Sequence, residues 1–129
     1  GNLINDGIPG GAIARAVKNR IDPNVAVTKK YGVKLLAYEG GQHLLRVDGA
    51  HVIRDEKIFE LFSKANRDPR MIQAYQQYLQ AWKRSGAGMM MHFNGISNID
   101  NRNYFAMLER PENPNSAKYR AMMNYLRAR

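Results

Sequence analysis

The sequence predicts an α/β fold with two parallel strands that form only part of a larger sheet. Two short apolar runs, 33–38 and 89–94, each end in polar residues and glycine, a pattern typical of buried strands. Segments with helical spacing of apolar residues precede, separate and follow these runs, so the connection is long enough for a crossover between parallel strands. Two such strands cannot form a stable sheet alone. We therefore expect the missing strands to come from another segment or chain.

The first predicted helix covers residues 10–21. Its apolar residues recur at four-residue steps, at Ile13, Val17 and Ile21. Asp22 and Pro23 should interrupt it, because an N-cap followed by proline begins a new helix. We expect this second, short helix to reach about Tyr31 and to end at Gly32.

The predicted strand 33–38 ends in a group of polar residues. Glu39, Gln42 and His43 follow it directly, and the glycines at 40 and 41 allow the backbone to turn sharply. Parallel α/β folds bind their ligands at the carboxyl edge of the sheet. The loop 39–54 is also longer than an ordinary connection, and long loops often carry function.

Two more helices are predicted between the strands. Asp55 is the expected N-cap of the first, which should end near Arg67. Asp68 and Pro69 open the second, which has the clearest helical pattern and should stop at Gly86. Trp82 in this helix is expected to pack against the sheet.

The predicted strand 89–94 places His92 and Asn94 on one face, which we expect to be the ligand side. A polar loop, 96–115, follows it and offers Tyr104 and Phe105 as exposed aromatic platforms for a sugar. Asn115 or Ser116 should cap a final helix. The expected apolar face of that helix contains Tyr119, Met122, Met123 and Leu126.

Composition limits the function classes. The 129 residues suffice for one modest domain, and a hydrophobic content of 44% allows a packed core. Cysteine is absent, which excludes disulfides, thiolate metal sites and a cysteine nucleophile. No apolar run is long enough to span a membrane, and no signal peptide is visible. Glu39, His43 and His92 fit no known metal-ligand spacing, so we expect neither a metal nor a cofactor.

The net charge of +9 favours anionic partners. The basic residues are dispersed, however, and the densest groups lie at predicted helix ends, where cations complement the helix dipole. No aromatic-basic platform or zinc-finger spacing is present, so nucleic acid is an unlikely partner on these grounds.

The segment Tyr38–Leu44, Tyr-Glu-Gly-Gly-Gln-His-Leu, resembles a motif of large secreted bacterial proteins described as glycoside-hydrolase-like or cellulose-binding. Further pieces resemble that family in the same order over about residues 12–129. They are Asn66–Met71, Tyr78–Lys83, Met91–Asn94, Tyr104–Glu109 and Ser116–Ala121.

The resemblance implies a (β/α)8 barrel of the TIM type. Residues 33–38 would be its seventh strand and 89–94 its eighth, so that 1–129 is the C-terminal segment of one barrel domain. A whole barrel needs about 250 residues. In such glycosidases the seventh strand ends in a nucleophilic glutamate, which corresponds here to Glu39. The general acid/base, expected on strand four, is not in this chain, and the location implied is extracellular or the cell surface.

The function expected on this basis is a carbohydrate-active module that binds or hydrolyses polysaccharide. Glu39 is the candidate nucleophile, and the substrate contacts expected are Gln42, His43, His92, Asn94, Tyr104 and Phe105. The excess of basic over acidic residues favours an acidic glycan. The alternative is a non-catalytic structural or assembly subunit, completed by partner chains, in which Glu39 only holds the turn at the two glycines.

Overall fold

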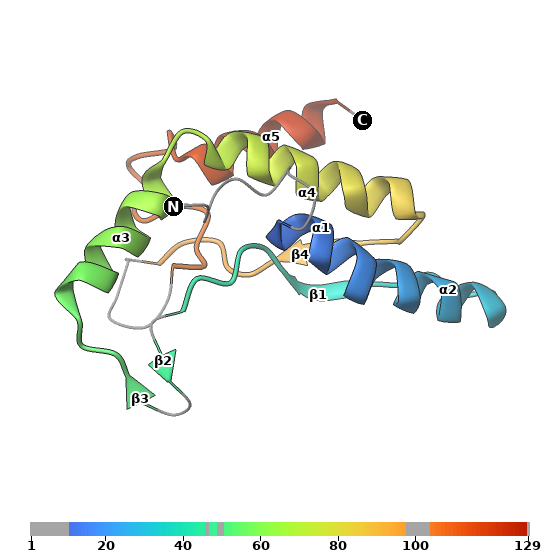
Figure 1. Ribbon diagram of the computed structural model, residues 1–129. Coiled ribbons are helices and arrows are strands. Elements are labelled where there is room, and N and C mark those ends of the chain that lie inside the picture. The colour runs from blue at the N-terminus through green and yellow to red at the C-terminus, as the bar shows by residue number, and fades with distance from the viewer. Residues whose placement is uncertain (1–10, 46, 49–50, 98–103, 129) are drawn as a thin grey trace.

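The computed structural model describes residues 11–45, 47–48, 51–97 and 104–128. Within these ranges the chain is a mixed α/β structure with a two-stranded parallel sheet, and its helices lie on one side of that sheet (Figure 1). The prediction of two parallel strands joined through helices is confirmed.

The described residues open with one continuous helical stretch, made of α1 (Ala12–Ala16), the π-helical turn η1 (Val17–Ile21) and α2 (Asp22–Lys30). The predicted interruption at Asp22 and Pro23 is therefore wrong. The N–H of Asp22 bonds the carbonyl of Val17, five residues back, so the helix widens by one residue before the proline. Pro23 then occupies a first-turn position of α2, where its missing N–H costs little.

Strands β1 (Ala37–Gly40) and β4 (Met90–His92) form the parallel sheet, with Ala37 opposite Met90 and Gly40 opposite His92. Both strands are shorter than predicted, and β1 also lies further along the chain, so that Glu39 belongs to the strand and does not follow it. The predicted loop 39–54 contains a small antiparallel pair, β2 (Val47–Asp48) and β3 (His51–Val52).

The remaining helices are α3 (Glu56–Arg67), α4 (Met71–Ser85) and α5 (Ala117–Arg127). The predicted N-caps of α3 and α5 are confirmed: Asp55 accepts the backbone N–H of Lys57 at 2.8 Å, and Ser116 accepts that of Tyr119 at 3.1 Å. The predicted cap of α4 is wrong, because the helix begins only at Met71 and Asp68 accepts the N–H of Arg70 in the turn before it, at 2.8 Å. Gly86 closes α4 with a φ of 79°, a conformation that suits glycine.

Helix α5 packs through a different face from the one predicted. Its buried residues are Ala117, Lys118 and Ala121, whereas Leu126 is 46% exposed. The small residues allow α5 to approach α4 closely, and Ala117 and Ala121 join a buried cluster with Met71, Ala74 and Tyr75.

A second buried cluster joins the helices to the sheet. It consists of Ile21, Val25 and Trp82, against which Leu35, Ala37 and Met90 pack. Trp82 is 7% exposed, and its indole N–H donates to the carbonyl of Gly88 at 2.8 Å. The expected role of Trp82 in helix-to-sheet packing is confirmed.

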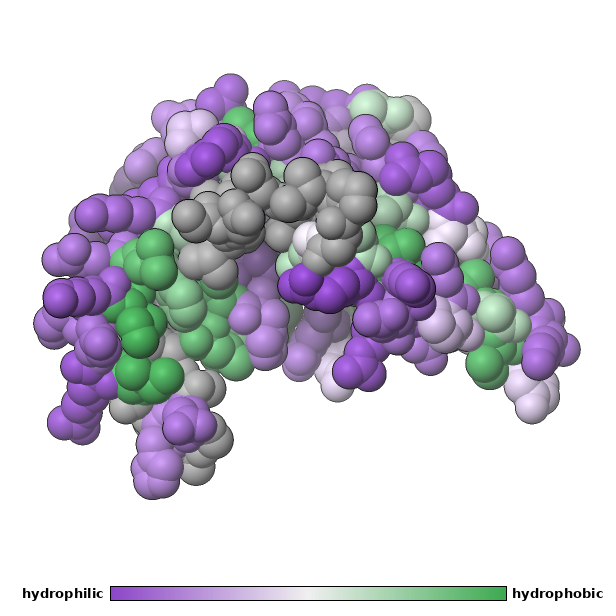
Figure 2. Space-filling model, viewed as in Figure 1, coloured by the Kyte–Doolittle hydropathy of each residue, from purple (hydrophilic) through white to green (hydrophobic). Residues whose placement is uncertain are grey.

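The other face of the sheet is open and apolar. Leu36 is 63% exposed, Tyr38 77% and Met91 51%, so the expectation that both faces are buried is wrong for the described residues. Helices cover only one side of β1 and β4 (Figure 1). A further group of hydrophobic side chains gathers over α3, in a view that is otherwise mostly hydrophilic (Figure 2). No helix among the described residues is both long and apolar enough to cross a membrane.

Candidate functional site

A β-bulge displays Glu39 at the carboxyl end of β1. Between the paired positions Ala37 and Gly40, β1 has two residues, Tyr38 and Glu39, where β4 has only Met91. Tyr38 and Glu39 are both exposed, although the side chains of a regular strand would alternate between the two faces. Bulges of this kind re-aim side chains at the rims of sheets. Among the described residues, no hydrogen bond or ion pair engages the Glu39 carboxylate.

Gly41 makes the turn after β1 possible, as predicted. Its φ of 134° is a conformation that other residues rarely adopt, and a Cβ at this position would lie 2.9 Å from Nε2 of His92. The absence of a side chain therefore lets the loop pass directly beside the His92 ring.

Gln42 ties this loop to the segment after β4. Its side-chain amide donates to the backbone carbonyl of Tyr104, and its side-chain oxygen accepts the N–H of Leu44 at 2.6 Å. Its own backbone N–H donates to the Tyr75 hydroxyl at 3.2 Å. These bonds engage both ends of the amide, so Gln42 positions the loop around Glu39.

His92 lies on the helix side of the sheet, and the expectation that it faces the ligand side is wrong. The Tyr75 hydroxyl lies 2.8 Å from Nε2, and the carbonyl of Asn94 lies 3.2 Å from Nδ1. Since that carbonyl can only accept, Nδ1 carries the proton and Nε2 accepts from Tyr75. Burial lowers the pKa of His92 to about 4, which keeps the ring neutral. In this arrangement both ring nitrogens are engaged.

Three rings connect the loop after β1 with the segments after β4. His43, which is exposed, stacks on Phe105 with ring centroids 5.4 Å apart and planes 26° apart. Phe105 in turn contacts Phe93, with centroids 5.7 Å apart, and Phe93 is 42% exposed. The N–H of Phe93 donates to the carbonyl of Gly40 at 2.8 Å, which fixes this group next to the bulge.

Tyr104 cannot be the exposed platform that we expected, because it is only 2% exposed. Its ring contacts Phe62 edge to face, and its backbone carbonyl accepts from Gln42 and from the ammonium of Lys118, the latter at 2.7 Å. Tyr104 is therefore a buried anchor of the segment that carries Phe105.

Asn94 is partly buried, and its side-chain oxygen has no hydrogen-bond partner among the described residues. Its backbone carbonyl accepts from His92 and from the N–H of Met107. The structure thus brings Asn94 and His92 together through the Asn94 backbone carbonyl.

Sequence reasoning missed two features of this region. Tyr38 is the most exposed aromatic residue at the site, and only the bulge, which no local pattern announces, places it beside Glu39 on the open face. Lys118 is 1% exposed, and burial lowers its pKa to about 7. Nothing in the sequence around Lys118 gave a reason to expect that this lysine is buried.

The site has the chemistry of a polar edge with aromatic walls. The Glu39 carboxylate and the rings of Tyr38 and Phe93 are exposed at this edge. A cavity of about 320 Å³ lies between α1, α4 and the loop 41–44, so that Gln42 and His43 line it together with alanine, methionine and tyrosine side chains. Within the described part of the chain, no three histidine, aspartate or glutamate side chains are placed to hold a metal ion. No family model, curated protein or solved structure matches this chain.

Proposed function

We propose that the carboxyl edge of β1 and β4 binds a polysaccharide. The observation that carries the proposal is that exposed Glu39 and Tyr38 and the exposed ring of Phe93, which packs on half-buried Phe105, belong to the same edge of the sheet, where the N–H of Phe93 bonds the carbonyl of Gly40. A sugar ring has an apolar face, which stacks on an aromatic side chain, and hydroxyls at its edge, which donate to a carboxylate. This arrangement supplies both contacts at one place. The resemblance of the Tyr38–Leu44 motif to glycoside-hydrolase-like proteins supports the same assignment.

Hydrolysis would require a second carboxyl group. Retaining glycosidases place the two carboxyls about 5–5.5 Å apart, and inverting enzymes about 6.5–9.5 Å apart. Glu39 is suited to the nucleophile's role, since it is displayed at the end of a parallel strand and is not engaged by other described residues. The acid/base group would come from a segment outside the described residues or from a partner chain.

A (β/α)8 barrel is the architecture that we propose for the complete protein, with β1 and β4 as its seventh and eighth strands. Two features support it: the strands are parallel, and the helices that pack on them cover only one face. In a barrel the open face, with Leu36 and Met91, would face the interior. An extracellular or cell-surface location follows from the resemblance alone, and the basic balance favours an acidic glycan.

The alternative function is an assembly subunit without catalysis. It is favoured by the same open face, whose apolar side chains would be covered by strands from a partner chain. Under this proposal Glu39 would have no substrate, and mutation of the aromatic rings would affect assembly rather than glycan binding.

Affinity electrophoresis in gels that contain neutral or acidic polysaccharides tests the binding proposal. The informative variant is Phe105→Leu, which retains an apolar side chain but removes the ring. The matched control is Tyr31→Leu at the end of α2, where the ring is 78% exposed and remote in the fold from the strand ends. Retardation that is lost in the first variant and kept in the second supports the proposal. Equal retardation of both would refute it.

Turnover is tested by Glu39→Gln in the complete protein or assembly, with Glu60→Gln as the control. Glu60 is an exposed carboxylate on α3 that pairs with Lys64, at 3.8 Å. If Glu39 is the nucleophile, the first variant loses glycan hydrolysis and the second retains it. Undiminished hydrolysis by Glu39→Gln would exclude the nucleophile assignment.

A further inference from the structure

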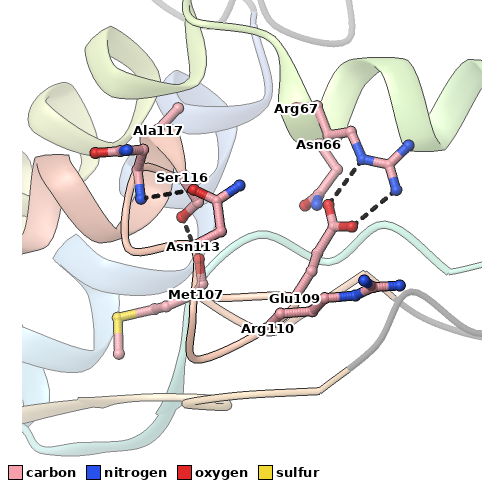
Figure 3. Close-up of a pocket in the computed structure, with 9 residues that line it drawn as sticks. Asn66, Arg67, Met107, Glu109, Arg110, Asn113, Ser116 and Ala117 are labelled. Carbon is pink, nitrogen blue, oxygen red and sulfur yellow. Dashed lines mark hydrogen bonds and ion pairs between the residues drawn. The ribbon is translucent and has the colours of Figure 1, made fainter.

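A polar pocket lies between the end of α3 and the start of α5. It has a volume of about 480 Å³, which is within the range of sites for small ligands. Figure 3 shows Asn66 and Arg67, at the end of α3, on one side of it, and Ser116 and Ala117, at the start of α5, on the other. Residues 107–110 connect the two sides.

Asn66 carries an unused acceptor in this pocket. The residue is only 5% exposed, and its Oδ1 has no hydrogen-bond partner among the described residues. Most buried polar atoms in proteins are paired, because an unpaired one has lost its bonds to water without gaining others. A ligand that donates a hydrogen bond at this point, such as a hydroxyl, would supply the missing bond.

Arg67 and Glu109 form a rigid polar wall next to Asn66. Nε and Nη2 of Arg67 donate to the two carboxylate oxygens of Glu109 at 2.9 and 2.7 Å. This two-bond geometry fixes both planes. Each carboxylate oxygen keeps a second acceptor site, and the guanidinium keeps further N–H groups. A fixed wall that both donates and accepts matches hydroxyl groups, which do both as well.

The pocket is also positively charged. Glu109 balances Arg67, whereas Arg110 adds a second guanidinium at the pocket without a second lining carboxylate. The start of α5, an eleven-residue helix, contributes the positive end of its dipole. Ser116 and Asn113 add polar groups on that side, where Ser116 also fixes the wall by donating to the carbonyl of Met107.

We propose that this pocket holds one sugar unit of an acidic glycan. A ring hydroxyl donates to Oδ1 of Asn66, and the carboxylate or sulfate ester of the sugar faces the guanidinium of Arg110, whose side chain extends toward the Arg67 side of the pocket (Figure 3). The inference rests on the proposed function, since it adds a second subsite for the same polymer. The Cα atoms of Phe105 and Arg110 are five residues apart and so at most about 18 Å from each other. One glycan chain of a few units can therefore reach both places.

Isothermal titration calorimetry tests the inference. The three probes are a galacturonate hexamer, a sulfated galactose hexamer and a neutral glucose hexamer. The variants are Asn66→Leu, which removes the acceptor at similar volume, and Arg110→Gln, which changes only an exposed charge. The control is Arg84→Gln, an exposed arginine near the end of α4. We expect at least one acidic hexamer to bind more tightly than the neutral one. Its Kd should weaken about tenfold in Asn66→Leu and severalfold in Arg110→Gln, and remain unchanged in the control.

The outcomes separate the two proposals. Loss of binding in Phe105→Leu with unchanged binding in Asn66→Leu and Arg110→Gln overturns the second subsite and leaves the first intact. A tighter interaction with the neutral hexamer than with either acidic one overturns the acidic assignment. Absence of binding to all three probes by the unmodified protein would refute the proposed function itself, and the second subsite with it. If Asn66→Leu fails to fold, Arg110→Gln decides alone. A weaker salt dependence of Kd in this variant supports the second subsite, and an unchanged salt dependence overturns it.

Discussion

Protonation of His92 should weaken the contact between β4 and α4. Its ring is held between the Tyr75 hydroxyl and the carbonyl of Asn94, and burial lowers its pKa to about 4 from an ordinary value of 6.5. The unfolded chain therefore binds a proton near pH 6.5 that the folded chain does not take up until about pH 4. In that window the unfolded state holds more protons, so the free energy of unfolding falls as the pH falls. The total loss is about 3 kcal/mol.

The assay is urea unfolding between pH 4 and 7, for the unmodified protein and for His92→Gln, combined with an NMR titration of the histidine ring protons. Glutamine cannot be protonated, so the difference in unfolding free energy between the two proteins should change by about 3 kcal/mol across the window. Comparison with the variant separates the pH dependence caused by His92 from that caused by carboxylates, which take up protons in a similar pH range. A His92 pKa at or above 6.5, or the same pH dependence in both proteins, would refute the reasoning.

Three further predictions concern the core and the open face. Trp82→Phe should lower the free energy of unfolding by about 1–3 kcal/mol, since the Gly88 carbonyl loses its donor. Trp82→Ala should lower it by about 3–5 kcal/mol, and equal losses for the two variants in urea unfolding would contradict this expectation. Lys118→Met should abolish the stability gain, about 2 kcal/mol, that a buried lysine with a pKa of about 7 produces between pH 7 and 9; a gain retained in the variant would exclude Lys118 as its source. Leu36→Lys with Met91→Lys should reduce self-association in sedimentation runs, whereas cooperative unfolding of the unmodified chain as a monomer would show that the sheet needs no partner.

Local chemistry predicted much of the backbone. Asp55 and Ser116 cap their helices because side-chain oxygens accept first-turn N–H groups, and Gly86 ends α4 because it tolerates a positive φ. The parallel pairing followed from two apolar runs separated by helices. Pro23 is the exception: it was predicted to interrupt the helix, but a π-helical turn precedes it and the helix continues.

The faces of the strands were not predictable in the same way. Which side of β4 meets the helices depends on the packing of α4, so strand alternation alone could not place His92. The bulge at Tyr38 and Glu39 depends on pairing between distant segments. Tyr104 is buried because Gln42 and Lys118, far away in sequence, donate to its carbonyl. Tertiary contacts therefore determined the site, whereas short-range spacing determined the elements around it.

The central claim is that glycans bind at the carboxyl edge of β1 and β4. Backbone amide chemical shifts, recorded by NMR during titration with the acidic and neutral hexamers, test it most directly. The account predicts that the earliest and largest changes fall on residues 38–43, 93–94 and 105, with Tyr31 unaffected. Changes confined to other parts of the chain, or none with any hexamer, would contradict it.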